Sequence, residues 1–175
     1  MTLPTASGYR ITTTQGQGFD VLTLETAVTQ ELVCHCKIHP FCGSEVVYPV
    51  IVMTMSPQHR QALPDLKLLL LDHLLHQHRA ILLSAGNDTA GGRFSFQTQL
   101  EYAMAHGYNA YQLVGSQIKR FDDKDLQTAL ARPWGKRLPL VLLSRHELPL
   151  DMAYDIPTDL VHSLDKPDAR AALGG

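Results

Sequence analysis

The sequence predicts an α/β fold, of the α+β kind in which helices cover a mixed sheet. Three observations support this fold class. A β-branched apolar run at residues 45–55 is typical of a buried strand. A leucine-rich segment at 66–75 has the spacing of a helix that is buried on most sides. Short apolar runs then alternate with helical patterns up to residue 143, as expected when strands and helices share one core.

Length and composition fit one compact unit. The chain has 175 residues, of which 45% are hydrophobic and 18% charged, and these values exclude a disordered or coiled-coil protein. No apolar stretch approaches the roughly 18 residues of a spanning helix, and the first ten residues lack the apolar core of a signal peptide. Three cysteines within nine positions are a poor basis for a disulfide framework. We therefore expect a cytoplasmic protein without membrane insertion.

The first half of the chain predicts a lead-in, two strands and a helix before a third strand. Residues 1–18 are polar and predict a lead-in, and residues 19–24 predict a short strand. After the strand at 45–55, Ser56 and Pro57 are typical of the N-cap and first position of a helix. Pro64 marks a second start, immediately before the leucine-rich helix. The run RAILLSA at 79–85 predicts the next strand.

The segment after residue 86 determines the topology. Residues 87–92 have turn chemistry, and 93–97 alternate polar and aromatic residues, which predicts a hairpin return against RAILLSA. Thr98 and Glu101 then have the spacing of a capping box, so a helix is expected to begin at Thr98 and to end at Gly107. One alternative is a parallel, doubly wound sheet, which needs a continuous helix over 93–106.

The last elements are a strand at 109–114, a helix capped by Asp122 and stopped by Pro133, and a strand at 138–143. An extended tail follows, with at most a short helix after Thr158.

Residues 119–145 carry seven basic residues against three aspartates, whereas residues 147–170 carry six acids against two basic residues. These patterns predict a lead-in with a Cys/His segment at 1–44, a core at 45–146 and an acidic tail at 147–175. Either the basic block is a phosphate-binding face that the acidic block shields, or both blocks are ordinary solvated surface.

The Cys/His segment at 34–42 allows two interpretations. Cys34, Cys36, His39 and Cys42 are ligands that zinc accepts, but four ligands from nine consecutive residues lack the second pair that usually completes the tetrahedron. Alternatively, Cys34 and Cys36 share one face of an extended segment and pack as small apolar side chains. The second interpretation is favoured, and no metal site is predicted.

Two further groups offer chemistry. Asp72 and His76 are an i, i+4 pair that suits a metal or proton transfer, although polar-face histidines explain the pattern as well. The loop 84–93 is small and glycine-rich, so its backbone N–H groups can hold phosphate, although an ordinary turn is the simpler interpretation. It contains neither the Walker nor the dinucleotide-binding pattern.

The layout TAGGRFSFQTQLEYAMAHGYNAYQLV at 89–114, within the order of elements over 45–131, resembles the ParB/sulfiredoxin superfamily. Where partition proteins of that family carry G-E-R-R and sulfiredoxins G-C-H-R, this chain has Phe96-Gln97-Thr98-Gln99. The family's phosphate-binding arginine therefore has no counterpart at its usual place, and Arg93 is the candidate substitute. The sulfiredoxin cysteine is missing as well, which disfavours sulfinic acid repair.

The resemblance implies an ATP-binding, nucleotide-hydrolysing protein that acts on DNA, like the plasmid fertility-inhibition factors, with ATP and Mg²⁺ as cofactors and a conjugation or secretion-system protein as a partner. It implies catalytic roles for Glu101, Arg93 and Asp72. The phosphate-binding residues would be Gly91, Gly92, Arg93, Gln97, Thr98 and Gln99. The DNA backbone would be contacted by Lys119, Arg120, Lys136 and Arg137. The alternative is a non-enzymatic inhibitor that docks on a partner protein through its basic face or acidic tail.

Overall fold

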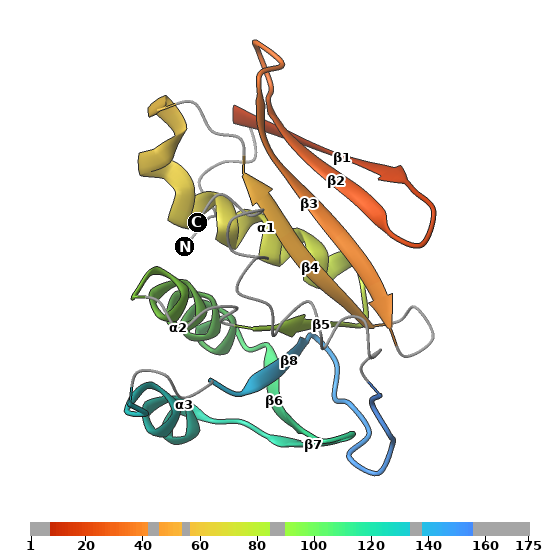
Figure 1. Ribbon diagram of the computed structural model, residues 1–175, viewed down its shortest axis with the longest axis vertical. Coiled ribbons are helices and arrows are strands. Elements are labelled where there is room, and N and C mark those ends of the chain that lie inside the picture. The colour runs from red at the N-terminus through yellow and green to blue at the C-terminus, as the bar shows by residue number, and fades with distance from the viewer. Residues whose placement is uncertain (1–7, 42–45, 54–56, 85–89, 134–137, 156–175) are drawn as a thin grey trace.

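The computed structural model describes residues 8–41, 46–53, 57–84, 90–133 and 138–155. These residues form an eight-stranded mixed sheet and three α-helices, an α+β architecture (Figure 1). The elements are β1 (Tyr9–Gln15), β2 (Asp20–Thr26), β3 (Leu32–Phe41), β4 (Val46–Met53), a 3₁₀ helix η2 (Pro57–Ala62), α1 (Leu63–Gln77), β5 (Ala80–Leu83), α2 (Ala90–Ala105), β6 (Asn109–Val114), β7 (Gln117–Arg120), α3 (Asp123–Leu130) and β8 (Leu140–Ser144).

The sheet has the order β1-β2-β3-β4-β5-β8-β6-β7. Every neighbouring pair is antiparallel except β4 and β5, which are parallel. A parallel pair needs a crossover connection, and α1 supplies it. The sheet is therefore mixed, as predicted, and the alternative of a parallel, doubly wound sheet is wrong.

The first three strands form an antiparallel extension of the sheet. The strand predicted at 19–24 is confirmed as β2, but the polar lead-in is wrong for residues 9–15, which form β1. Only Tyr9 and Ile11 of β1 pack against the core, and the residues after Ile11 are exposed, so the strand has a polar sequence. β3 pairs with β4, so the sheet runs through the boundary predicted at residues 44 and 45.

The predicted strand at 45–55, the leucine-rich helix and the strand RAILLSA are confirmed as β4, α1 and β5. Leucines of α1 are buried around much of its circumference, which explains why the helix carries so little polar sequence. The 3₁₀ turn η2 begins at Pro57 and leads into α1, which has Pro64 in its first turn.

The predicted hairpin at 93–97 is wrong, because α2 is one continuous helix from Ala90 to Ala105. Phe96 is 1% exposed and Phe94 is 62% exposed, so the two aromatic side chains face opposite ways, as helical residues two apart do. The predicted capping box is wrong for the same reason. Thr98 Oγ1 donates to the carbonyl oxygen of Phe94 within the helix at 2.8 Å, and Glu101 accepts from Gln97 Nε2 at 2.8 Å.

The predicted helix end at Gly107 is confirmed. Gly107 has a φ of +78°, a conformation that glycine adopts without strain, and Tyr108 N donates to Ala103 O at 2.9 Å. The strand at 109–114 is confirmed as β6, and the last strand is confirmed as β8, which lies between β5 and β6. Asp122 caps α3 as predicted, and Asp125 N donates to its Oδ1 at 2.9 Å. β7 was not predicted, although Gly115-Ser116 is a two-residue hairpin signal.

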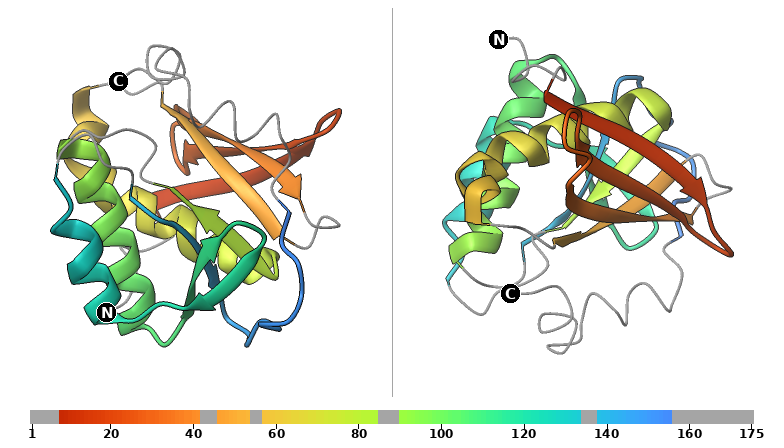
Figure 2. Two further views of the ribbon diagram at one scale, coloured as in Figure 1. Left: turned by 60° about the horizontal axis from the view of Figure 1, so that its bottom comes forward. Right: turned by 90° about the horizontal axis from the view of Figure 1, so that it is seen from above.

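Two groups of buried residues lie on the two faces of the sheet. On one face, alternate residues of β5, β6 and β8 pack with α1, α2 and α3. Figure 2 shows the helices gathered on one side of these strands. On the other face, the intervening residues pack with Leu148 and Tyr154. Leu148 N donates to Tyr111 Oη at 3.1 Å, and Tyr154 N donates to Ser116 O at 2.6 Å.

The chain after residue 146 was predicted as an extended acidic tail. Residues 148 to 154 instead complete the core of the second face, because Leu148 and Tyr154 are at most 5% exposed. The short helix predicted after Thr158 lies outside the described residues. None of the described helices has the length and apolar character needed to cross a membrane.

Candidate functional site

The parallel strands β4 and β5 separate soon after they begin. They share two register pairs, Val46 with Ala80 and Val47 with Ile81. β4 then stays paired with β3 as far as Met53, and β5 stays paired with β8. Figure 1 shows the two strands diverging toward their arrowheads. Among the described residues, the edge of β4 that faces β5 has no ladder partner after Val47.

Both helices that follow these strands begin at the end where the strands diverge. α1 follows β4 and α2 follows β5, so their first turns lie beyond the carboxyl ends of the parallel pair. Ligands of sheet proteins are commonly bound at this kind of position, outside the carboxyl ends of adjacent parallel strands.

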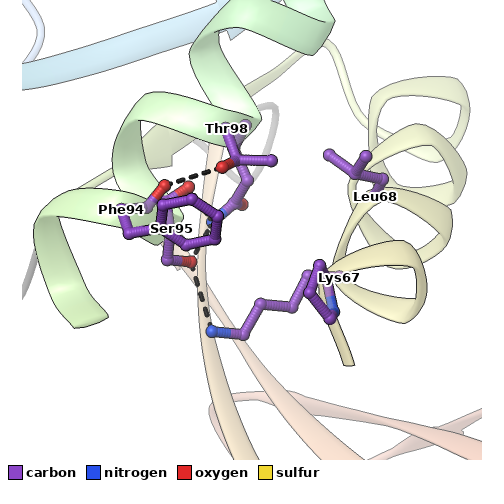
Figure 3. Close-up of a pocket in the computed structure, with 7 residues that line it drawn as sticks. Lys67, Leu68, Phe94, Ser95 and Thr98 are labelled. Atoms are coloured by element: carbon purple, nitrogen blue, oxygen red, sulfur yellow. Dashed lines mark hydrogen bonds between the residues drawn. The ribbon is translucent and has the colours of Figure 1, made fainter. Parts of the chain in front are cut away.

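A pocket of about 200 Å³ lies between the N-terminal halves of α1 and α2 (Figure 3). It is lined by Pro64, Lys67, Leu68, Phe94, Ser95, Thr98 and Gln99. In Figure 3, Leu68 and Thr98 face one another across the pocket, and Lys67 extends toward Ser95 on the opposite helix. The lining is thus mostly apolar, with its polar groups on one side of α2 and at Lys67.

The polar groups of the pocket bond to one another. Lys67 Nζ donates to Ser95 Oγ at 3.2 Å, and Gln99 Nε2 donates to the same oxygen at 2.9 Å. Burial lowers the pKa of Lys67, because the charged ammonium loses hydration in this surrounding. Lys67 was not among the predicted site residues. The sequence does contain an indication of Lys67, because it is the one charged residue in the otherwise apolar run from Leu66 to Leu71.

The predicted phosphate-binding residues divide among different faces of α2. Thr98 and Gln99 line the pocket, while Gln97 pairs with Glu101. Gly91 and Gly92 lie in the first turn of α2, where helix N–H groups lack partners within the helix. The start of this helix is therefore at the glycines rather than at Thr98.

Arg93 joins α2 to the end of α3. Its guanidinium donates to Arg132 O at 2.9 Å and to Pro133 O at 3.1 Å, with a longer contact to Leu130 O at 3.4 Å. The side chain is buried, at 9% exposure. The described bonds thus give Arg93 a structural function, because it satisfies carbonyl groups that the end of α3 leaves without helical partners.

We expect Arg93→Ala to lower the free energy of unfolding by about 2 kcal/mol, because the hydrogen bonds from a buried charged group to the carbonyls of Leu130, Arg132 and Pro133 are lost. Urea denaturation followed by circular dichroism measures the change. Arg10→Ala is the control, since Arg10 forms an ion pair with Glu25 at 2.8 Å while half exposed, and such pairs contribute little. Equal effects of the two substitutions would contradict the structural function of Arg93.

The two predicted catalytic carboxylates have separate surroundings. Glu101 is exposed on α2. Asp72, on α1, accepts from Tyr108 Oη at 2.5 Å, and its Oδ2 lies 3.6 Å from His76 Nδ1. Burial and the Asp72 carboxylate raise the pKa of Tyr108, so the phenol stays protonated. The Asp72–His76 pair of the prediction is present, and its carboxylate is engaged with a tyrosine that the sequence did not indicate.

Cys34 and Cys36 both lie on β3 and are fully buried in the core, as the packing interpretation predicts. His35 and His39 occupy alternate positions of the same strand, so they lie on its opposite face. Among the described residues no group of three or more metal-binding side chains is found. Cys42 lies outside the described residues.

We expect Cys34 to resist iodoacetamide in the folded protein and to react in urea. Burial raises its pKa from 9.0 to about 11, which lowers the thiolate fraction at neutral pH about 100-fold before access is considered. Peptide mass spectrometry of native and unfolded samples measures the extent of Cys34 alkylation in each state. Rapid alkylation of native Cys34 would show that this thiol is not in the core.

The structure describes two of the four predicted DNA-backbone residues. Lys119 and Arg120 are adjacent on β7 and point to opposite sides of the strand. Arg120 Nη2 pairs with Glu147 at 2.8 Å, and its guanidinium lies 5.7 Å from the centre of the Tyr111 ring. Lys136 and Arg137 lie outside the described residues. A DNA-binding surface stays a prediction.

Neither a scan against protein-family models nor searches of curated proteins and of solved structures gives a match to this chain.

Proposed function

We propose that the protein binds a coenzyme A thioester at the diverging ends of β4 and β5 and uses it for acyl transfer. The observation that carries the proposal is the separation of the parallel strands after two register pairs, with a pocket between the helices that follow them. Each part of this region favours a different part of such a ligand.

The open edge of β4 favours an extended chain with amide groups. Backbone N–H and C=O groups need hydrogen-bond partners, and the part of β4 after Val47 has no ladder partner on its β5 side among the described residues. A strand edge without a ladder partner can accept another extended chain through backbone hydrogen bonds. The ligand is therefore expected to present amides along an extended arm.

The start of α2 favours a phosphate group. The first turn of α2 contains Gly91 and Gly92 and no acidic residue, so its N–H groups and the helix dipole favour an anion. The first turn of α1 contains Asp65, which makes it the less favourable of the two helix ends. Phosphate at Gly91 and Gly92 also agrees with their predicted role.

The pocket favours an uncharged part of the ligand, because Pro64, Leu68 and Phe94 supply most of its apolar lining. Coenzyme A combines phosphates with an extended, amide-bearing arm that ends in a thiol, so it meets all three requirements. The competing hypothesis is the one that the ParB/sulfiredoxin resemblance implies: a protein that binds ATP and Mg²⁺, acts on DNA and inhibits conjugation. That hypothesis gives no function to the open β4 edge.

Isothermal titration calorimetry of the whole protein tests the proposal. Coenzyme A and acetyl-coenzyme A are titrated separately, next to ATP with Mg²⁺ and to pantetheine, which has the arm without the phosphates. We expect coenzyme A to bind at least about tenfold more tightly than ATP or pantetheine, a difference of about 1.4 kcal/mol. Binding of ATP alone would favour nucleotide hydrolysis, and absence of coenzyme A binding would overturn the proposal.

A further inference from the structure

We propose that Lys67 is an acyl acceptor: its side-chain amine attacks an acyl thioester held in the pocket between α1 and α2 and becomes an Nε-acyl-lysine. The inference rests on the proposed function, because that function supplies the thioester. It adds a site of covalent modification on the protein itself.

The surroundings of Lys67 are those of a reactive amine. Lys67 lines a pocket whose other described lining residues include no acid, and its hydrogen bond is to the Ser95 hydroxyl at 3.2 Å. Leu68 and Phe94 contribute apolar surface to the same pocket. Burial lowers the pKa of the amine and increases the neutral fraction, and a desolvated lysine in an apolar pocket is the form that attacks carbonyl groups.

Ser95 positions the amine. Gln99 Nε2 donates to Ser95 Oγ at 2.9 Å and approaches Ser95 O at 3.2 Å, so the hydroxyl oxygen is held between Gln99 and Lys67. Lys67 Nζ donates to that oxygen. A neutral amine that donates an N–H in this way keeps its lone pair available for a carbonyl carbon in the pocket.

The step is balanced without a further reactant. The nitrogen lone pair forms a bond to the thioester carbonyl carbon, and the carbon–sulfur bond breaks. The sulfur leaves with its electron pair, and the proton released by the amine goes to it, which gives free thiol and an amide on Lys67. The product is uncharged, so acylation also removes the only cationic side chain among the described residues that line the pocket.

Mass spectrometry after incubation with a thioester tests the inference. Two probes are used: acetyl-coenzyme A, and S-acetyl-N-acetylcysteamine, which has the thioester without the phosphates. Lys119 is the internal control, because it is an exposed lysine on β7. We expect Lys67 to be acetylated at least about tenfold faster than Lys119, because burial lowers the pKa of Lys67 and so favours its neutral, nucleophilic amine, and we expect the rate to rise as the pH is raised. Lys67→Arg should remove this acetylation and leave that of Lys119 unchanged.

The outcomes separate the two proposals. If coenzyme A binds in calorimetry but Lys67 reacts no faster than Lys119 with either probe, the acceptor function is overturned and the proposed function stands. If the small thioester acetylates Lys67 selectively while coenzyme A does not bind, the proposed function is overturned and the reactive amine is supported. Selective acetylation by both probes supports both.

Discussion

Phe96→Ala is expected to lower the free energy of unfolding by about 3 to 5 kcal/mol, whereas Phe94→Ala is expected to change it by less than about 0.5 kcal/mol. Phe96 is 1% exposed in the core beneath α2, and its truncation leaves a cavity among Leu100 and neighbouring side chains. Phe94 is 62% exposed, so its truncation removes little buried surface. Urea denaturation of the two variants and the wild type measures the difference.

This pair of variants distinguishes the helix from the hairpin that the sequence suggested. In a strand, residues 94 and 96 share a face, so both substitutions would have similar effects. In α2 the two side chains lie on opposite sides. Equal losses of stability from Phe94→Ala and Phe96→Ala would therefore contradict the continuous helix.

A bulky residue at Thr98 is expected to weaken coenzyme A binding at least about tenfold without loss of stability. Thr98 lines the pocket opposite Leu68, so Thr98→Phe fills space that the ligand would occupy (Figure 3). The pocket of about 200 Å³ leaves little room for both the phenyl ring and a ligand. Calorimetric titration of the variant with coenzyme A measures the loss.

Thr128→Phe is the matched control. Thr128 also lies in a helix and donates its hydroxyl to the carbonyl oxygen four residues earlier, Lys124 O, at 2.9 Å, but it is exposed on α3. The control variant should bind coenzyme A like the wild type. If both variants bind normally, the pocket is not part of the ligand site, and if both lose binding, the loss has a cause other than filling the pocket.

The elements with strong apolar patterns could be predicted from the sequence. β4 and α1 carry long apolar runs, and the Asp122 cap and Gly107 end follow from local hydrogen bonding and backbone preference. β1 could not be predicted in the same way, because only Tyr9 and Ile11 face the core. Its strand conformation comes from pairing with β2, which is not visible in its own residues.

The candidate site depended on contacts between distant segments. The alternation at 93–97 is compatible with a strand, but burial of Phe96 against the core decides in favour of a helix, and the same turn of the helix directs Arg93 to the end of α3. Thr98 and Gln99 were predicted as ligand-binding residues and do line a pocket. Lys67 enters that pocket because α1 and α2 lie side by side, which only the tertiary structure shows.

Hydrogen–deuterium exchange of the whole protein, with and without coenzyme A, tests most directly that the ligand lies at the diverging ends of β4 and β5. Slower exchange is expected in peptides that contain the second half of β4 and the first turn of α2, because their amides would gain partners from the ligand. Peptides from β1 and β2 should be unchanged. Protection confined to other segments, or no change at a saturating concentration, would contradict the proposed site.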